Sequence, residues 1–184
     1  MSIAIYVLLA VGWIVWLIPF FGRKPGGGQS AVATDKRARW GILLVTVAYW
    51  MVWVKNPFWL RQPATWKVAV SICFFTAGSV LVWSAVRTLG RQWRIDAGLN
   101  SDHELVRTGP YTLVRHPIYL SMFCMFLATG FLVASTRVLL LAGIVFLIGT
   151  EIRMRIEDGL LKARFGAEFE AYRRGVRGYL PLVR

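Results

Sequence analysis

The chain has 184 residues, of which 57% are hydrophobic, and its formal net charge is +13. A soluble domain of this length is too small to bury so much apolar surface, so the composition favours an integral membrane protein with a single domain, residues 1–184. Nucleic-acid binding is disfavoured, because the basic residues lie between apolar runs and not on a soluble surface. The two cysteines and two histidines lack metal-ligand spacing, so we expect no metal site and no disulfide.

Five apolar runs are each expected to form a membrane helix. The first run is too long for a signal-peptide core, so we interpret it as a retained helix. The second run has 15 residues and the fifth only 13, so their ends require snorkelling Arg or Lys side chains. Three residues separate the fourth and fifth runs, which predicts a tight helical hairpin. The runs are Ile3–Phe21, Trp40–Val54, Val68–Val86, Ile118–Ala134 and Val138–Thr150.

The basic residues predict the orientation of the chain. The first and third loops and the tail after Thr150 contain 18 of the 22 Lys and Arg residues, and they lie on one side if five helices span. By the positive-inside rule that side is cytoplasmic and the N-terminus lies outside. Tryptophans near the ends of the runs predict an interfacial aromatic belt. These are Trp13, Trp16, Trp40, Trp50, Trp53, Trp59, Trp66 and Trp83.

A polar segment interrupts the membrane pattern between residues 93 and 119. Gly109-Pro110 is a turn signal, and Pro117 is suited to the first turn of a helix that begins after His116. A helix start has free backbone N–H groups, here beside Arg115 and Tyr119, which suits an adenine or a carboxylate. Alternatively, this is a plain loop whose Arg115 and His116 contact lipid headgroups.

The tail from Glu151 to Arg184 is the second polar segment. An apolar stripe at helical spacing predicts that the last membrane helix continues along the membrane surface, with Gly166 ending it. Arg153 and Glu157 are one helical turn apart, so Arg153 could clamp an anionic acceptor while Glu157 binds an ammonium group. Alternatively they form an ordinary salt bridge on an amphipathic helix, which is also what the i,i+4 spacing of Glu151 and Arg155 predicts for that pair. The stripe consists of Ile152, Ile156, Leu160 and Leu161.

Together the two segments resemble the isoprenylcysteine carboxyl methyltransferase family, which merges into the phospholipid N-methyltransferases. The resemblance covers roughly the last ninety residues, and it implies that residues 87–184 form the cofactor-binding and catalytic part, whereas residues 1–86 are generic membrane helices. The implied fold is all-α, with about five transmembrane helices and a cytosolic pocket formed by the loop before helix 4 and the helical tail. The residues that carry it are His103–Val106, Gly109–Tyr111, Arg115–Tyr119, Arg153, Glu157, Phe165-Gly166, Tyr172 and Pro181.

The resemblance also implies roles for individual residues. Arg153 and Glu157 are the implied catalytic residues, Arg153 by binding the acceptor and Glu157 by holding the amino group of S-adenosylmethionine. The sequence departs from the family pattern at Ser121, where relatives often have glycine, and at Arg177, where they have proline. The implied cofactor-binding residues are His103, Glu104, Leu105, Val106, Tyr111, Arg115, His116, Pro117, Ile118, Tyr119 and Glu157.

The expected function is therefore methyl transfer from S-adenosylmethionine to a lipid-like acceptor, such as an isoprenylcysteine-type carboxylate, at the cytoplasmic membrane face. Its partners are that acceptor and the surrounding membrane lipids. Three alternatives stay open. They are a phospholipid N-methyltransferase, in which Glu157 is the only obvious base, a membrane NAD(P)H-dependent reductase and a non-enzymatic membrane scaffold.

Overall fold

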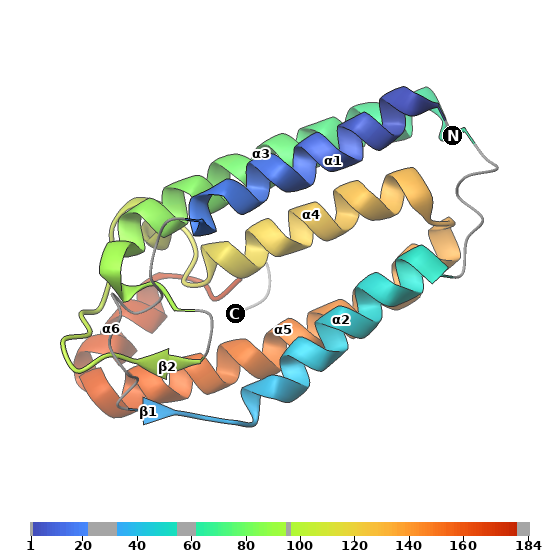
Figure 1. Ribbon diagram of the computed structural model, residues 1–184. Coiled ribbons are helices and arrows are strands. Elements are labelled where there is room, and N and C mark those ends of the chain that lie inside the picture. Colours follow the sequence, from blue (N-terminus) through green and yellow to red (C-terminus); the bar gives the residue numbers. More distant parts are fainter. Residues whose placement is uncertain (1, 22–32, 55–61, 95–96, 180–184) are drawn as a thin grey trace.

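Five long helices run alongside one another in alternating directions, and a short sixth helix lies at one end (Figure 1). The computed structural model describes residues 2–21, 33–54, 62–94 and 97–179. All five apolar runs form helices, as expected, and the fifth continues through the charged stretch to Phe165. The helices are α1 (Ile3–Leu17), α2 (Ala38–Val54), α3 (Thr65–Leu89), α4 (Pro117–Val133), α5 (Thr136–Phe165) and α6 (Ala167–Gly175).

Short elements gather at the end of the bundle that carries α6 (Figure 1). Among the described residues, the 3₁₀ turns η1 (Ile18–Phe20), η4 (Gly90–Gln92) and η5 (Gly109–Thr112) lie there. Two strands that an all-α expectation omits, β1 (Ala33–Thr34) and β2 (Gly98–Leu99), pair antiparallel. This ladder joins the segment before α2 to the segment after α3.

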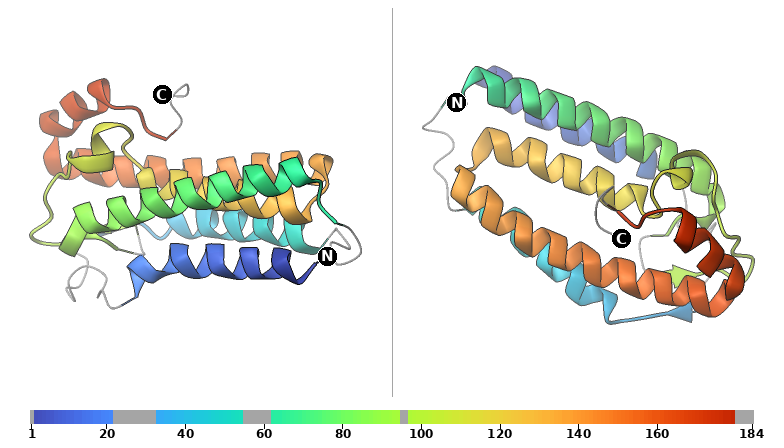
Figure 2. Two further views of the ribbon diagram at one scale, coloured as in Figure 1. Left: turned by 90° about the horizontal axis from the view of Figure 1, so that it is seen from above. Right: turned by 180° about the vertical axis from the view of Figure 1, so that it is seen from behind.

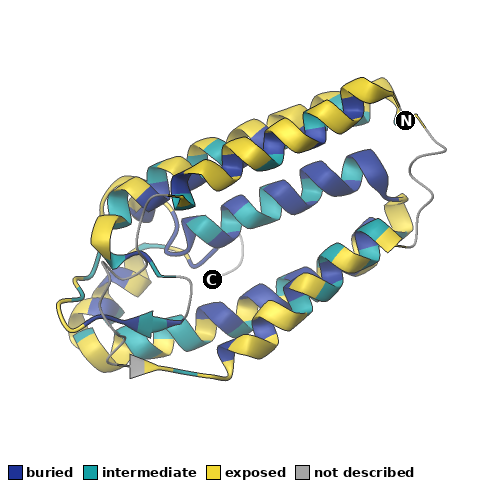
Figure 3. Cartoon of the chain, in the orientation of Figure 1, coloured by how far each residue is buried: buried dark blue, intermediate teal, exposed yellow. Residues whose placement is uncertain are grey.

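The helices pack in two pairs, α3 against α4 and α2 against α5 (Figure 2). Only Ala134 and Ser135 separate α4 from α5, as the predicted hairpin requires. However, α4 and α5 diverge from their connection toward the end that carries α6 (Figure 1). Figure 3 shows α4 as the most buried helix of the bundle, and none of its residues is exposed.

Two glycines allow α2 and α5 to approach closely. A Cβ on Gly41 would lie 2.5 Å from the carbonyl oxygen of Gly149, and one on Gly149 would lie 2.8 Å from that of Gly41. Such distances are too short for any side chain, so glycine is required at both positions. The same hypothetical Cβ on Gly41 would lie 2.6 Å from Cγ of Arg153, so this crossing also sets the position of that arginine.

The tryptophans do not all form an interfacial belt. Trp16 is buried, and its Nε1 donates a hydrogen bond to Oγ of Ser121 at 3.2 Å. Trp13 donates to Thr129 in the same way at 3.2 Å. For Trp16 the belt prediction is therefore wrong, because its indole packs in the core between α1 and α4. Trp40, Trp50, Trp66 and Trp83 are exposed, as the prediction requires, and Trp59 lies outside the described residues.

Two of the helical segments, Ile3–Phe20 and Thr65–Gln92, are long and apolar enough to cross a membrane. Helices α2 and α4 are apolar but shorter. Large apolar side chains are exposed along the outward faces of the bundle, for example Ile14, Val80 and Leu140. Such an apolar surface is unfavourable in water and fits contact with lipid. The structure is therefore that of a predominantly helical membrane protein.

Candidate functional site

A cavity of about 810 Å³ opens at the α6 end of the bundle, where α4 and α5 diverge. One part of its wall is apolar, with Trp16, Phe20 and Val45 from the first two helices and their flanks. The other part is polar and comes from the segment before α4, from the first turn of α4 and from α5. Its titratable lining residues are Arg94, His103, Tyr111, Arg115, His116, Tyr119, Arg153 and Glu157.

The start of α4 brings His116 and Tyr119 to this cavity. His116 is the N-cap residue, with a non-helical backbone conformation, and Pro117 is the first helical residue. The prediction that a helix begins directly after His116 is therefore confirmed. Pro117 is favourable there because its missing N–H would lack a helical partner in any case. Both His116 and Tyr119 are buried, at 7% exposure each.

The segment after α6 holds the residues before α4 in place. The backbone N–H of Arg115 donates to the carbonyl of Arg177 at 2.8 Å, and that of His116 donates to Gly178 at 2.9 Å. The guanidinium of Arg115 also donates to the carbonyls of Arg173, at 3.3 Å, and Val176. At Arg177 the backbone carbonyl makes this contact, and the side chain is exposed. The tail thus docks on the N-terminal end of α4.

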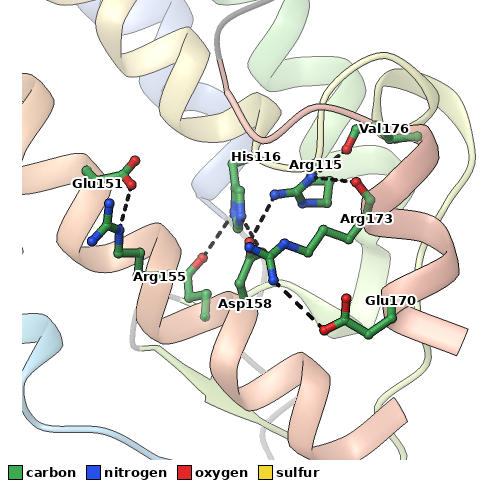
Figure 4. A network of polar contacts seen from close by, with 9 residues as sticks. Arg115, His116, Glu151, Arg155, Asp158, Glu170, Arg173 and Val176 are labelled. Carbon is green, nitrogen blue, oxygen red and sulfur yellow. Dashed lines mark hydrogen bonds and ion pairs between the residues drawn. The ribbon is translucent and has the colours of Figure 1, made fainter. Parts of the chain in front are cut away.

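Asp158 on α5 joins these residues into an ion cluster (Figure 4). Its Oδ2 lies 3.0 Å from Nη2 of Arg115, and its Oδ1 lies 2.9 Å from Nε2 of His116. Burial lowers the pKa of His116, but the hydrogen bonds and negative charges of Asp158 and Glu157 outweigh burial and raise this pKa to about 9. The imidazole is therefore a cation at neutral pH. Burial raises the pKa of Asp158, but His116 and Arg115 together hold it below the ordinary value.

Tyr119, Arg153 and Glu157 form a second cluster beside the first. The Tyr119 hydroxyl donates to Oε1 of Glu157 and accepts a hydrogen bond from Nε of Arg153 at 2.6 Å. Nη2 of Arg153 lies 3.4 Å from Oε1 of Glu157, and Nδ1 of His116 lies 3.6 Å from Oε2. Glu157 therefore connects the two clusters. Its carboxylate is shared among three donors, all of which line the cavity.

These contacts differ from those of a plain loop and from those of a surface salt bridge. Arg115 and His116 are buried and paired with carboxylates, so they are not exposed residues of a plain loop. Arg153 is only 7% exposed, so its pair with Glu157 is not a surface salt bridge. The Glu151–Arg155 pair, at 2.7 Å, has that character, since both side chains are exposed.

The segment before α4 contributes less to the cavity than the resemblance implies. His103 and Tyr111 line it, as do Pro117 and Ile118, but Glu104, Leu105 and Val106 do not. His103 is half-buried, beside the ring of Phe165, and burial lowers its pKa. Tyr111 is fixed through its carbonyl, which accepts a hydrogen bond from the Tyr172 hydroxyl at 2.6 Å. Pro181 lies outside the described residues.

Three buried polar atoms on the cavity residues have no hydrogen-bond partner within the described part of the chain. They are Nδ1 of His103, Oε1 of Gln92 and Nε of Arg115. A buried polar group without a partner costs stability, so such atoms commonly await a ligand or water. Donors, acceptors and an adjoining apolar wall fit an amphipathic ligand with a polar, charged group such as the amino-acid part of S-adenosylmethionine.

Sequence reasoning missed two contributions to the site. Asp158 was not singled out, although an acidic residue directly after Glu157 was a visible signal, because one residue along a helix turns the side chain away by 100°. The apolar wall was missed because the first two helices carry no motif. Ser121, where the sequence departs from the pattern of the resembled family, accepts the Trp16 hydrogen bond and donates to the Ile118 carbonyl at 2.7 Å.

A model of the phospholipid methyltransferase family matches residues 66–168, which is more than half of the chain. The matched region runs from α3 through α5 and includes both ion clusters. It therefore covers the polar part of the cavity but not the apolar wall supplied by α1 and α2. Within the described ranges, no three His, Cys, Asp or Glu side chains come together as a possible metal-binding group.

Several curated proteins are similar to this chain. The protein-S-isoprenylcysteine O-methyltransferase of Schizosaccharomyces pombe is 32% identical over 112 residues, which are 60% of this chain and 48% of that protein. Its counterpart in Saccharomyces cerevisiae is 34% identical over 83 residues, 45% of this chain and 35% of that protein. The nickel-cobalt-cadmium resistance protein NccN of Alcaligenes xylosoxydans xylosoxydans is 31% identical over 118 residues, 64% and 53% respectively. The match thus spans about half the length of two of these relatives and about a third of the Saccharomyces cerevisiae protein.

Proposed function

The chain belongs to the phospholipid methyltransferase family, and from that premise we propose that it transfers a methyl group from S-adenosylmethionine to a lipid-like acceptor at the cytoplasmic membrane face. The observation that carries the proposal is one cavity with a charged part and an apolar part. A lipid-like acceptor needs apolar wall for its chain and charged groups for its reacting end. Family membership favours this reading over the reductase and scaffold alternatives.

We assign the charged part of the cavity to the cofactor and to the reacting end of the acceptor. In this assignment Glu157 binds the amino group of the cofactor, and His103, Tyr111, His116 and Tyr119 contact its other polar groups. When bound, S-adenosylmethionine supplies a methyl group that is attached to a positively charged sulfur. As an acceptor atom bonds to the methyl carbon, the bond from that carbon to sulfur breaks, and the rest of the cofactor leaves as a neutral thioether. The protein contributes alignment and exclusion of water.

The charge of the site favours an anionic acceptor. Arg115, His116 and Arg153 carry three positive charges, against the two negative charges of Glu157 and Asp158. A carboxylate acceptor fits this balance and needs no base, and the Arg153 guanidinium can orient it. An amine acceptor would have to lose a proton. Glu157 is the nearby carboxylate, but it is already engaged by Tyr119, Arg153 and His116.

A phospholipid amine nevertheless remains the second candidate acceptor, since the matching family is described by phospholipid methylation. In that case Glu157 must exchange its contacts with Tyr119 and Arg153 for one with the amine. The two candidates differ in the product, which is a methyl ester for a carboxylate and an N-methylated headgroup for an amine.

The proposal also includes the membrane orientation. Five spans would place β1, β2, η5 and α6 on one side, and the N-terminus and the α4–α5 connection on the other (Figure 1). The side with α6 carries most of the basic residues and is cytoplasmic by the positive-inside rule. Because S-adenosylmethionine is made in the cytosol, a cavity at that end has access to it.

Ligand-dependent thermal stability of the purified chain in detergent tests the proposal. S-adenosylhomocysteine, the product form of the cofactor, should raise the melting temperature, whereas NADPH should not, because only a ligand of the folded state stabilises it. Labelled S-adenosylmethionine is then supplied with membrane lipids and with a farnesylated cysteine analogue. A base-labile label on the analogue identifies a carboxylate acceptor, and a base-stable label on lipid identifies an amine. Stabilisation by NADPH alone would refute the methyltransferase proposal.

A further inference from the structure

A second cavity, of about 320 Å³, lies beside the C-terminal end of α6, and nearly all of its wall is arginine. It is distinct from the large cavity, although Arg115 lines both. The other lining residues are Arg173, Arg174, Val176 and Arg177. Four of its five lining residues are arginines, so positive charge is concentrated around this small volume, and an anion there would reduce the repulsion.

The carboxylates of the neighbouring elements do not neutralise this cavity. Glu170 on α6 pairs with a lysine of α5 at 2.8 Å and reaches Arg173 only at 3.9 Å. Asp158 is shared between Arg115 and His116. Within the described part of the chain, neither Arg174 nor Arg177 forms an ion pair with a carboxylate. The cavity therefore has uncompensated positive charge.

Arg115 gives the cavity a fixed wall. It is only 9% exposed, and its two terminal nitrogens are held by Asp158 and by the carbonyls of Arg173 and Val176 (Figure 4). Its Nε is buried and has no hydrogen-bond partner among the described residues. A rigid guanidinium needs no further ordering to bind an anion, so less entropy is lost on binding than with a flexible surface side chain.

The cavity also lies at a depth where lipid phosphates are found. Arg115 is two residues before Pro117, the first residue of α4, and α4 is a membrane helix in the proposed topology. The start of a membrane helix lies near the boundary between hydrocarbon and headgroups. On the cytoplasmic side that boundary contains anionic lipids, which attract clusters of arginine.

We propose that this second cavity, between Arg115 and the end of α6, is a binding site for a phosphate-class anion. The anion is either the phosphate of an anionic phospholipid headgroup or free phosphate, since guanidinium groups recognise both through the same bidentate hydrogen bonds. The site goes beyond the proposed methyl transfer, which does not require it. Because Arg115 and the tail contact the start of α4, an anion bound here also steadies the docking of the tail next to the large cavity.

The test compares the full chain with two double variants of equal charge. Arg174→Gln/Arg177→Gln removes two charges from the cavity, and Arg39→Gln/Arg87→Gln removes two exposed charges from the same end of the bundle, away from it. Neither pair belongs to the proposed methyl-transfer site. In neutral detergent at constant ionic strength, inorganic phosphate and a short-chain phosphatidylglycerol are titrated separately, with short-chain phosphatidylcholine as the zwitterionic control. Affinity is read from the rise in melting temperature.

We expect the cavity variant to lose about 25-fold in affinity for the anion, as each arginine near a charged lipid surface contributes about fivefold. The Arg39/Arg87 variant should bind like the wild type. Tighter binding of phosphatidylglycerol than of phosphate identifies a lipid headgroup as the ligand, and equal affinities identify free phosphate. If both double variants lose affinity equally, or if neither anion binds the wild type more tightly than phosphatidylcholine does, the site does not exist.

Two further measurements separate this result from misfolding and from the proposed function. Arg174→Lys/Arg177→Lys keeps the charge and should bind more tightly than the glutamine variant, so a fold defect common to both would be recognised. Binding of S-adenosylhomocysteine is measured on the same samples. If it is absent from the wild type while phosphate binding responds to the cavity variant, the methyltransferase proposal fails and the anion site stands.

Discussion

Nε2 of His116 lies 2.9 Å from Oδ1 of Asp158, so an ion pair joins the start of α4 to the C-terminal third of α5 across 42 residues of sequence. This is the end of the bundle where the two helices diverge around the large cavity. The pair therefore fixes the width of the cavity as well as the orientation of the imidazole. Asp158 makes no contact with the cavity itself, and its proposed role is to position His116 and Arg115.

Asp158→Asn should destabilise the protein, since it leaves Arg115 and His116 in a buried site with one negative charge fewer. Removing one partner of a buried ion pair costs on the order of 3–5 kcal/mol. The measurement is the loss of melting temperature in detergent. Glu151→Gln is the matched control, because its exposed pair with Arg155 contributes only about 0.2–1 kcal/mol. Equal losses in the two variants would contradict the buried ion cluster.

The His116 cation should make stability depend on alkaline pH. Its pKa is raised from 6.5 to about 9, so the stabilisation is fully present below pH 6.5 and is lost as the pH rises through about 9. The measurement is the difference in melting temperature between the wild type and His116→Gln, from about pH 6 to about pH 10. The difference should shrink with rising pH. A difference that is constant over the range would show that His116 is neutral throughout.

Glu157 and Arg153 should affect different steps. Glu157→Gln should cost cofactor affinity on the order of 1.5–3 kcal/mol, the contribution of a hydrogen bond to a charged group. Arg153→Lys should leave that affinity nearly unchanged but lower turnover, because an ammonium cannot reproduce the bidentate geometry of a guanidinium. Calorimetry with S-adenosylhomocysteine and a turnover assay separate the two effects. Wild-type values for both variants would remove this pair from the site.

Gly41→Ala should disturb the crossing of α2 and α5 and, with it, the side chain of Arg153. The added Cβ would lie 2.5 Å from the Gly149 carbonyl and 2.6 Å from Cγ of Arg153. Overpacking of this kind costs about 1–3 kcal/mol. Gly143→Ala is the control on α5, because its Cβ would meet its nearest neighbour at an ordinary 3.8 Å. We expect lower stability and lower turnover only for the Gly41 variant.

The proposed topology predicts opposite accessibility of two connections. In a variant without Cys73 and Cys124, a cysteine at Ser135 should react with an impermeant thiol reagent added to intact cells, whereas one at Ala171 on α6 should react only after the membrane is opened. Both positions are exposed, so the membrane alone decides the outcome. Labelling of Ala171→Cys from outside would overturn the topology and the access of the cavity to cytosolic S-adenosylmethionine.

The sequence by itself determined the helices and several of their ends. Apolar runs of 13 to 19 residues fixed where helices form, because a buried or lipid-facing backbone must satisfy its hydrogen bonds internally. Pro117 marked the start of α4, and Gly166, with a φ of +51°, ended α5 at Phe165. The resemblance to a methyltransferase family also singled out His116, Arg153 and Glu157 as site candidates.

Only the tertiary structure decided which residues meet. The pairing of α2 with α5 depends on the fit of Gly41 against Gly149, and no local pattern records that fit. Asp158 is part of the ion cluster because α5 runs past the start of α4. The packing of α2 against α5 sets the distance between Asp158 and His116. Trp16 lies in the core and not at the membrane interface, because Ser121 accepts the hydrogen bond of its indole. These contacts join residues far apart in the chain, and a sequence pattern constrains such contacts only weakly because its physical signals are local.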